Sequence, residues 1–506
     1  MGSGQADYRA GTLFWSDPVT WLGTPHAATN GPAPGANVSI PFGWNLVIDA
    51  SPPPLGLLLI EGNASFSSAA DVNLTATYIV VQGTGRLEAG SPEAPHPTRA
   101  TIKLAGDRQT RGLAISNDLV LGSKVLAVIN GGTLSLHGAR VSRRWTRLAA
   151  PAAAGSASLS ISGAALGWAV GQTVVVTSTT FNPDQAETRK ITGVTEVPAS
   201  GTGAENTTRL ALDAPLSWDH GARTASYPGS PYHLDMRAEV ALLDSNILVV
   251  PAEQDPASVA AVGGSRFGPV VLAAGTGTTV RVSQVASRYC GQSGLQRACW
   301  QFQGLANATA GSSGGSNASS SAAGGSYLSG VATFRGQDAS LRLLAASGSA
   351  RPPPLESAAS VLVEGSVFHE SYDVSTVVIA GPNNVLLNNL AMGTSKDMAG
   401  KSSFDQQLPA TFELLDAAAL NNTLRGNVAA GSHRIGFRVA GDACPAATPS
   451  ASLAAAAATP GAPGRPRRAQ VFEGNSAHSS LVSLVLADNL EGAPCTSLKN
   501  FSSWAL

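Results

Sequence analysis

Residues 361–371 read VLVEGSVFHES, and three later stretches follow the same pattern: VLLNNLAMGTS at 385–395, TLRGNVAAGSH at 423–433 and QVFEGNSAHSS at 470–480. In each stretch apolar residues alternate into a polar turn, and one column of that turn holds small polar residues: Ser366, Asn389, Asn427 and Asn475. The first two members of this column are 23 residues apart, which suits one coil of a parallel β-helix. Since a single coil cannot bury its apolar face alone, the pattern predicts stacked coils.

The column of Asn residues makes a specific prediction about the bend. An inward Asn can hydrogen-bond to its equivalents above and below and so satisfy buried backbone groups. We therefore expect Asn427 to face the core and its replacement by Leu to be destabilising. Asn422, five residues earlier and next to a glycosylation acceptor, is expected to tolerate Ala. A second β-prone run follows each turn, as in STVVIAG at 375–381 and RIGFRVAG at 434–441.

The rest of the chain is also predicted to be β. From residue 15 to 106, short β-prone runs are separated by Gly, Pro and Asn about every ten residues, which indicates a sheet with tight turns. Longer β-prone runs continue to residue 250, without helical periodicity. We predict a glycine-punctuated β-sheet domain at 12–140, a connecting β segment at 141–250 and a right-handed, single-stranded parallel β-helix at 251–506. Disordered insertions are predicted at about 303–326 and 443–468, because Gly, Ala, Ser and Pro cannot bury enough apolar surface.

The composition excludes some partners. Charged residues make up 13% of the chain, against about 25% in typical proteins, so Ser, Thr, Asn and Gly must cover much of the surface. The formal net charge of -1 gives no general attraction to nucleic acid or to an anionic membrane. No Cys or His spacing indicates a metal site, and no motif indicates a cofactor.

Several features favour a location outside the cell or at its surface. Eight N-x-S/T acceptors are candidate glycosylation sites: Asn37, Asn63, Asn73, Asn206, Asn307, Asn317, Asn421 and Asn500. Against this location, the N-terminal residues MGSGQADYRAG lack the basic and apolar regions of a signal peptide, which taken literally predicts a cytosolic protein. We interpret the chain as a fragment without its start and any C-terminal anchor, so it would meet a membrane only through an anchor absent from this sequence.

The four cysteines are an even number, which fits disulfide bonding. Cys290 and Cys299 are nine residues apart and flank a Gly-containing loop, and we predict that they are bonded to each other. Cys444 and Cys495 could form a second bridge.

The N-terminal half resembles a known family. The resemblance rests on glycine-centred motifs spread along the chain: WLG at 21–23, PGANV at 34–38, IPFG at 40–43, GTG at 83–85, GGTLSLHG at 131–138 and RAEVALL at 237–243. Together they resemble the G-eight domain family of fibrocystin-like and hyaluronan-depolymerising proteins, with the greatest similarity to its fibrocystin-L branch. Members carry a histidine-rich stretch at the start of the β-helix, whereas residues 327–364 contain no histidine.

Candidate catalytic residues lie in two acidic regions. Asp184 and Glu187 belong to a loop that resembles an acidic loop of the hyaluronan-cleaving relatives, and Arg237 and Glu239 would share one face of a strand. Glycoside hydrolysis generally needs two carboxyl groups across a cleft. The alternative interpretation is a set of solvated loop acids and a surface salt bridge. Lone histidines at the predicted coil bends, such as His369 and His433, are interpreted as structural or exposed.

Two functions therefore stay open. The first is a non-catalytic, fibrocystin-L-like ectodomain whose solenoid face binds a polysaccharide or an extracellular protein ligand. The second is an extracellular depolymerase of hyaluronan-type polysaccharides. The absent histidine stretch and the low density of clustered acids favour the first.

Overall fold

The computed structural model describes residues 11–115, 120–201, 205–226, 228–229, 233–253, 266–306, 325–345, 360–372, 374–395, 408–414, 419–440, 470–487 and 496–505. Strands dominate these residues, and helix is limited there to the short 3-10 segments η1 (Pro18–Trp21), η2 (Ala27–Thr29) and η3 (Pro183–Gln185). No helix in the described ranges is long and apolar enough to cross a membrane. The all-β prediction is confirmed.

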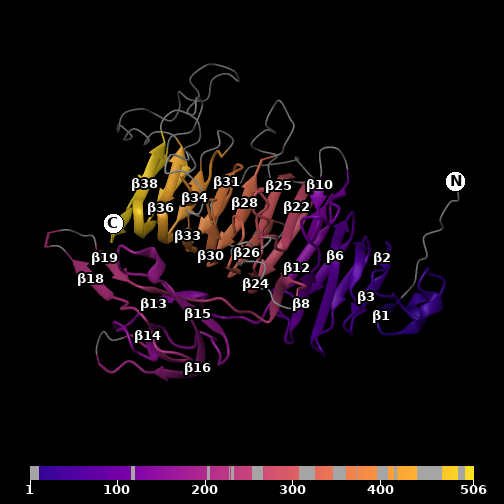
Figure 1. Cartoon of the computed structure of the whole chain (residues 1–506), viewed down its shortest axis with the longest axis horizontal. Coiled ribbons are helices and arrows are strands. Elements are labelled where there is room, and N and C mark those ends of the chain that lie inside the picture. The colour runs from indigo at the N-terminus through magenta and orange to yellow at the C-terminus, as the bar shows by residue number, and fades with distance from the viewer. Residues whose placement is uncertain are drawn as a thin grey trace, which may run out of the picture.

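One wall of the molecule is a parallel sheet with twelve described strands (Figure 1). Consecutive neighbours pair in register, so each coil adds one strand. The strands are β1 (Thr12–Phe14), β3 (Asn45–Ile48), β5 (Asn63–Phe66), β7 (Arg86–Ala89), β12 (Thr133–His137), β23 (Thr279–Ser283), β26 (Ser326–Ser329), β29 (Val361–Glu364), β32 (Val385–Leu387), β35 (Thr423–Arg425), β37 (Gln470–Glu473) and β39 (Thr496–Lys499).

The second sheet, with eighteen described strands, is also parallel, and its pairings form two ladders, so that a coil can add two strands to it. In Figure 1 its strands follow one another along the long axis of the molecule. They are β2 (Asn37–Ile40), β4 (Leu55–Ile60), β6 (Val72–Gln82), β8 (Ala100–Leu104), β11 (Val125–Ile129), β21 (Ile247–Pro251), β22 (Val270–Thr276), β24 (Val285–Arg288), β25 (Trp300–Ala306), β27 (Ala332–Phe334), β28 (Leu341–Leu344), β30 (Val367–Tyr372), β31 (Val377–Ala380), β33 (Leu390–Ser395), β34 (Ala410–Leu414), β36 (Val428–Ala440), β38 (Ser476–Ala487) and β40 (Ser502–Trp504).

The core of this β-helix is built from columns of apolar side chains, one from each coil. Alternate residues of each short strand point inward because successive side chains of a strand face opposite ways. One column in register consists of Ala89, Leu136, Val282, Leu328, Val363, Leu386, Leu424 and Phe472. This column continues across the predicted domain boundaries at residues 140 and 251. The glycine-punctuated residues therefore form the first coils of the same stack.

The Asn column forms the predicted buried ladder. Asn427 is fully buried, its Oδ1 accepts from the backbone N–H of Asn389 at 3.1 Å, and its Nδ2 donates to the carbonyl oxygen of Leu386 at 3.0 Å. The backbone N–H of Asn427 in turn donates to Asn475 Oδ1 at 2.9 Å. The inward orientation predicted for Asn427 is confirmed.

The expectation that Asn422 would tolerate Ala assumed an exposed side chain, and this assumption is wrong. Asn422 is fully buried, its Oδ1 accepts from the backbone N–H of Asn384 at 2.8 Å, and its Nδ2 donates to the carbonyl oxygen of Gly381 at 3.1 Å. The reason is the short length of β35: residues 422 and 427 lie at bends on either side of it, and both bends carry inward amides.

Between β12 and β21 the chain leaves the β-helix and forms an antiparallel unit, which we call the connecting domain (residues 141–246). Its six-stranded sheet contains β13 (Trp145–Arg147), β14 (Ser158–Ser162), β15 (Thr173–Val176), β16 (Glu187–Val197), β17 (Thr207–Leu212) and β20 (Glu239–Leu242). Two small antiparallel pairs complete the fold: β18 (Ala222–Ser226) with β19 (His233–Arg237), and β9 (Leu113–Ala114) with β10 (Val120–Gly122). The connecting domain has an apolar core of its own.

The connecting domain lies against the C-terminal coils (Figure 1). Val175, Ala241 and Leu243 pack on apolar residues of β27, β30, β33 and β36. Arg144 is buried in this contact, where its Nε donates to the carbonyl oxygen of Gly330 at 2.9 Å, and burial lowers its pKa to about 9. These contacts fix the loop that follows β15 relative to the β-helix.

The predicted disulfide between Cys290 and Cys299 is confirmed, with a Cα–Cα distance of 4.8 Å. Cys444, Cys495, Asn307 and Asn317 lie outside the described residues, as do most of the two predicted insertions. The edges of the first insertion are strand, because residues 303–306 belong to β25 and residue 326 to β26.

Candidate functional site

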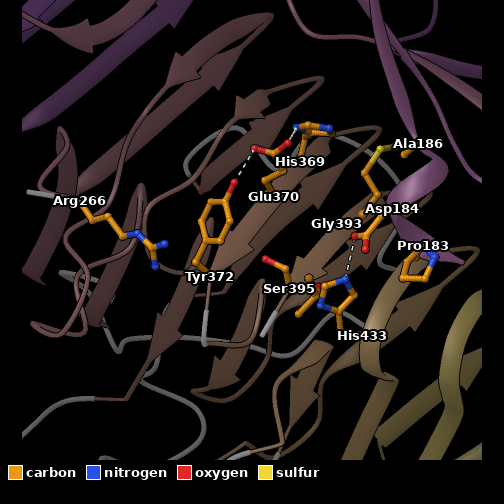
Figure 2. Close-up of a pocket in the computed structure, with 13 residues that line it drawn as sticks. Pro183, Asp184, Ala186, Arg266, His369, Glu370, Tyr372, Gly393, Ser395 and His433 are labelled. Carbon is orange, nitrogen blue, oxygen red and sulfur yellow. Dashed lines mark hydrogen bonds and ion pairs between the residues drawn. The ribbon is translucent and has the colours of Figure 1, made fainter. Parts of the chain in front are cut away.

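A cavity of about 430 Å³ opens where η3 of the connecting domain meets the C-terminal halves of β30 and β33 and the first half of β36 (Figure 2). We call it the junction pocket. Its lining residues are Pro183, Asp184, Ala186, Arg266, His369, Glu370, Tyr372, Met392, Gly393, Thr394, Ser395, Gly431 and His433. It therefore combines two carboxylates, two imidazoles, one guanidinium and one phenol.

Local hydrogen bonds shape the loop that brings Asp184 to the pocket. Asn182 begins η3, and its Oδ1 accepts from the backbone N–H of Asp184 at 3.0 Å. Ser178 Oγ donates to the carbonyl oxygen of Asn182 at 2.7 Å. Pro183, in the first turn, suits a helix start because its φ is already fixed there. These constraints hold the Asp184 carboxylate over β36.

Asp184 and His433 connect the connecting domain to the β-helix. His433 Nε2 lies 2.8 Å from Asp184 Oδ1, and the two side chains are 29% and 70% exposed. The carboxylate can hold the imidazole in one orientation. His433 is the last residue of the stretch TLRGNVAAGSH, so this contact starts at a coil bend.

The opposite side of the pocket is the end of β30. His369 is only 4% exposed, its Nδ1 lies 3.8 Å from Glu370 Oε1, and this nitrogen has no hydrogen-bond partner among the described residues. Burial lowers the pKa of His369. Tyr372 donates its hydroxyl to Glu370 Oε2 at 3.3 Å, and burial, assisted by Glu370, raises the pKa of Tyr372 to about 12. The guanidinium of Arg266 lies 4.9 Å from the centroid of the Tyr372 ring.

Glu187, although only three residues from Asp184, is buried inside the connecting domain. Its Oε1 accepts from the backbone N–H of Trp218 at 2.8 Å and its Oε2 from that of Ser217 at 2.9 Å, and His220 Nε2 lies 3.2 Å from Oε1. Burial would raise the pKa of Glu187, but these hydrogen bonds lower it below its ordinary value. This carboxylate holds the loop before His220 in place.

Arg237 and Glu239 also lie away from the pocket. Arg237 pairs with Asp235 at 2.8 Å. Glu239 is 1% exposed, and its Oε2 lies 2.9 Å from His478 Nε2 of the β-helix. Burial would raise the pKa of Glu239, but His478 and Arg147 lower it to about 2. The two residues do not share a strand as expected, because Arg237 ends β19 and Glu239 begins β20. Glu239 fastens the connecting domain to the last coils.

Of the four candidates named from the sequence, the fold brings only Asp184 into the junction pocket. Glu370, Tyr372 and Arg266 were not predicted from the sequence, and His369 and His433 were interpreted as structural or exposed. One signal was present: the aligned repeats end in HES, GTS and GSH at nearly the same position, which places polar residues of successive coils side by side.

Comparisons with known proteins agree with this architecture. Residues 20–149 match the G8 domain model. Human fibrocystin-L is 26% identical over 97% of this chain, which corresponds to 11% of that protein's length. Mouse fibrocystin is 31% identical over 46% of this chain and 5% of its own length. A G8 domain-containing protein of Dictyostelium discoideum is 27% identical over 52% of this chain and 21% of its own length.

Solved structures give only remote matches. The tailspike gp61 of Pseudomonas phage phi297 is 10% identical, covering 80% of this chain and 55% of its own, with a TM-score of 0.20. XylC in complex with xylose is 8% identical, covering 88% of this chain and 60% of its own, with a TM-score of 0.25. The G8 match and the alignment over nearly the whole sequence establish the resemblance: residues 20–149 match the G8 domain, and the chain as a whole is similar to fibrocystin-L.

Proposed function

We propose that this chain is part of an extracellular or cell-surface β-solenoid ectodomain that binds a glycan, or a glycan-bearing matrix protein, without cleaving it. The junction pocket is the observation that supports the proposal. It has the volume of a small-molecule site and brings convergent polar groups together with an aromatic ring. The chain spans 11% of the length of human fibrocystin-L, so the function of a longer protein would include other parts.

The chemistry of the pocket suits a sugar. Each sugar hydroxyl both donates and accepts hydrogen bonds, and the pocket offers acceptors on Asp184 and Glu370 and donors on Arg266 and the imidazoles. Tyr372 adds an apolar ring face with a polar end, which suits the mixed surface of a pyranose.

The glycosylation acceptors support an extracellular location. Asn37, Asn73, Asn206 and Asn500 are exposed, so an oligosaccharide could be attached to each without unfolding the strands around it. Expression through a secretory pathway, followed by enzymatic removal of N-linked glycans, should lower the apparent mass. An unchanged mass of the secreted protein would contradict this part of the proposal.

The binding proposal is tested by incubating the secreted protein with a panel of fluorescently labelled polysaccharides. We expect retention of at least one glycan and no shortening of its chains. A pocket variant, Tyr372→Ala, should reduce retention. The control Tyr78→Ala should retain the glycan, because the Tyr78 ring packs on an apolar cluster of β6, β10, β11 and β22 and does not line the pocket. Retention that is equal for both variants would place binding elsewhere on the solenoid.

Polysaccharide cleavage is the second candidate function. The observation favouring it is that two carboxyl groups, of Asp184 and Glu370, line one pocket, and that His433 is hydrogen-bonded to the first. Two carboxyls about 5 to 10 Å apart are the usual equipment for glycoside hydrolysis. Shortened chains in the same incubation, abolished by Asp184→Asn but not by Asp213→Asn in an exposed turn, would establish cleavage and refute the non-catalytic proposal.

A further inference from the structure

The space between His369 and Glu370 has the dimensions for a shared oxygen atom. His369 Nδ1 and Glu370 Oε1 are 3.8 Å apart, too far for a direct hydrogen bond. One oxygen can nevertheless lie about 2.8 Å from both atoms. His369 Nδ1 is buried and lacks a hydrogen-bond partner among the described residues, and a buried polar atom without a partner is costly. The position therefore favours a bound group that supplies the missing hydrogen bond.

The neighbouring charges restrict the chemistry of that group. The Glu370 carboxylate only accepts hydrogen bonds, and a neutral imidazole donates from one nitrogen and accepts at the other. Burial lowers the pKa of His369 and so favours its neutral form. A hydroxyl has one hydrogen to donate to Glu370, and its oxygen can at the same time accept from the imidazole N–H. A carboxylate or sulfate can only accept, and Glu370 would repel it.

Two glycines keep open the space beside this position. Register places Glu370, Gly393 and Gly431 on successive coils, all at positive φ. Positive φ alone does not demand glycine here, because other coils carry side chains at the same bend, as at Tyr289, Arg335, Glu370, Ser479 and Ala505. The available space is the difference: a Cβ at residue 393 would lie 3.3 Å from Glu370 Cγ, and one at residue 431 would lie 3.3 Å from Pro183 Cβ.

We propose that the junction pocket accepts an uncharged sugar unit, with one hydroxyl between His369 and Glu370 and the ring lying over Gly393 and Gly431. This inference rests on the proposed glycan-binding function and specifies its ligand class and orientation. It excludes uronate and sulfated units from this position, and it makes the two glycines determinants of specificity. Asp184 and His433 then lie at the open side of the same site.

The ligand class is tested with matched labelled oligosaccharides, one set made of neutral hexoses and one in which uronates or sulfated units replace them. We expect the secreted protein to bind at least one neutral oligosaccharide about ten-fold or more tightly than its acidic counterpart, as expected for one charge-assisted hydrogen bond gained or lost. Glu370→Gln should weaken binding of the neutral ligand. Glu364→Gln is the control, because Glu364 lies on the same coil but bonds Ser329 on the twelve-stranded sheet.

The role of the open space beside Glu370 is tested separately by Gly393→Ala and Gly365→Ala. Both glycines have positive φ, so both alanines impose backbone strain, but a Cβ at residue 365 meets no atom within 4 Å. Both variants should therefore lose similar thermal stability, and only Gly393→Ala should lose binding by about ten-fold or more. Circular dichroism confirms that each variant keeps its β structure.

The possible outcomes separate the inference from the function on which it rests. If the wild-type protein retains no glycan, both fail. If it retains glycans with the same affinity in Glu370→Gln, Gly393→Ala and their controls, binding occurs elsewhere, and this inference fails while the proposed function stands. Preference for uronate, sulfated or amino sugars refutes the ligand class even where the pocket variants lose binding.

Discussion

Replacing Asn427 by Leu should test the inner ladder of the β-helix. The substitution keeps a similar side-chain volume but removes an amide that serves two coils at once. In the folded chain its Oδ1 accepts from the backbone N–H of Asn389 at 3.1 Å, and its Nδ2 donates to the carbonyl oxygen of Leu386 at 3.0 Å. Both backbone groups would lose these contacts in a region closed to water.

The magnitude follows from counting those two groups. A buried backbone group left without a partner costs about 1–3 kcal/mol, so Asn427→Leu should lower the free energy of unfolding by about 2–6 kcal/mol. Asn475 is affected less, because its Oδ1 keeps the hydrogen bond from the backbone N–H of residue 427 at 2.9 Å.

Equilibrium unfolding in urea, followed by tryptophan fluorescence, measures this loss as a lower midpoint at an unchanged slope. Asn45→Leu is the matched control: the same replacement on the solvent face of β3, where the side chain is exposed and bonds only to other side chains. Its effect should stay within about 0.5 kcal/mol. Equal midpoints for the two variants would show that the inward amides do not hold the coils together.

Three further predictions concern other parts of the chain. Asn422→Ala should lower the free energy of unfolding by about 1–3 kcal/mol, because the buried backbone N–H of Asn384 loses its acceptor; a neutral effect in the same urea assay would contradict the second ladder. The pKa of Glu239, about 2 against an ordinary 4.5, means that its charge stabilises the fold above pH 4.5 and that this contribution is lost as the pH falls toward 2. Glu239→Gln should flatten this part of the curve of melting temperature against pH, and a curve identical to the wild type would refute the assignment. Cys290 and Cys299 should be alkylated only after reduction, as read by mass spectrometry, and labelling of both without reductant would rule out the bond.

The repeated stretches between 361 and 480 were enough to predict the solenoid and the orientation of Asn427. Their spacing fixes the coil length, and an alternating pattern allows only one face of each strand to be buried. The prediction for Asn422 was wrong. The repeat pattern indicates a bend near Asn427, but it does not indicate that the bends at both ends of the three-residue strand β35 carry inward amides.

The candidate site was predicted less well, because it depends on contacts between distant parts of the chain. Asp184 and His433 are 249 residues apart in sequence and 2.8 Å apart in space. Glu187 and Glu239 attracted attention as acidic residues, yet both are buried: Glu187 bonds inside the connecting domain, and Glu239 joins that domain to the β-helix. Residue type alone could not separate these structural carboxylates from those at the pocket.

The sequence by itself therefore determined the all-β class, the coil repeat, the inward Asn column and the bonded cysteine pair, since these depend on local periodicity and on residues close in the chain. Only the tertiary structure decided that the glycine-punctuated residues join the same stack and that the connecting domain folds back onto the late coils. The physical reason is that Val175, Ala241 and Leu243 pack against β27, β30, β33 and β36, which are distant in sequence. The sequence of one surface does not identify the other surface that it contacts. That contact creates the junction pocket.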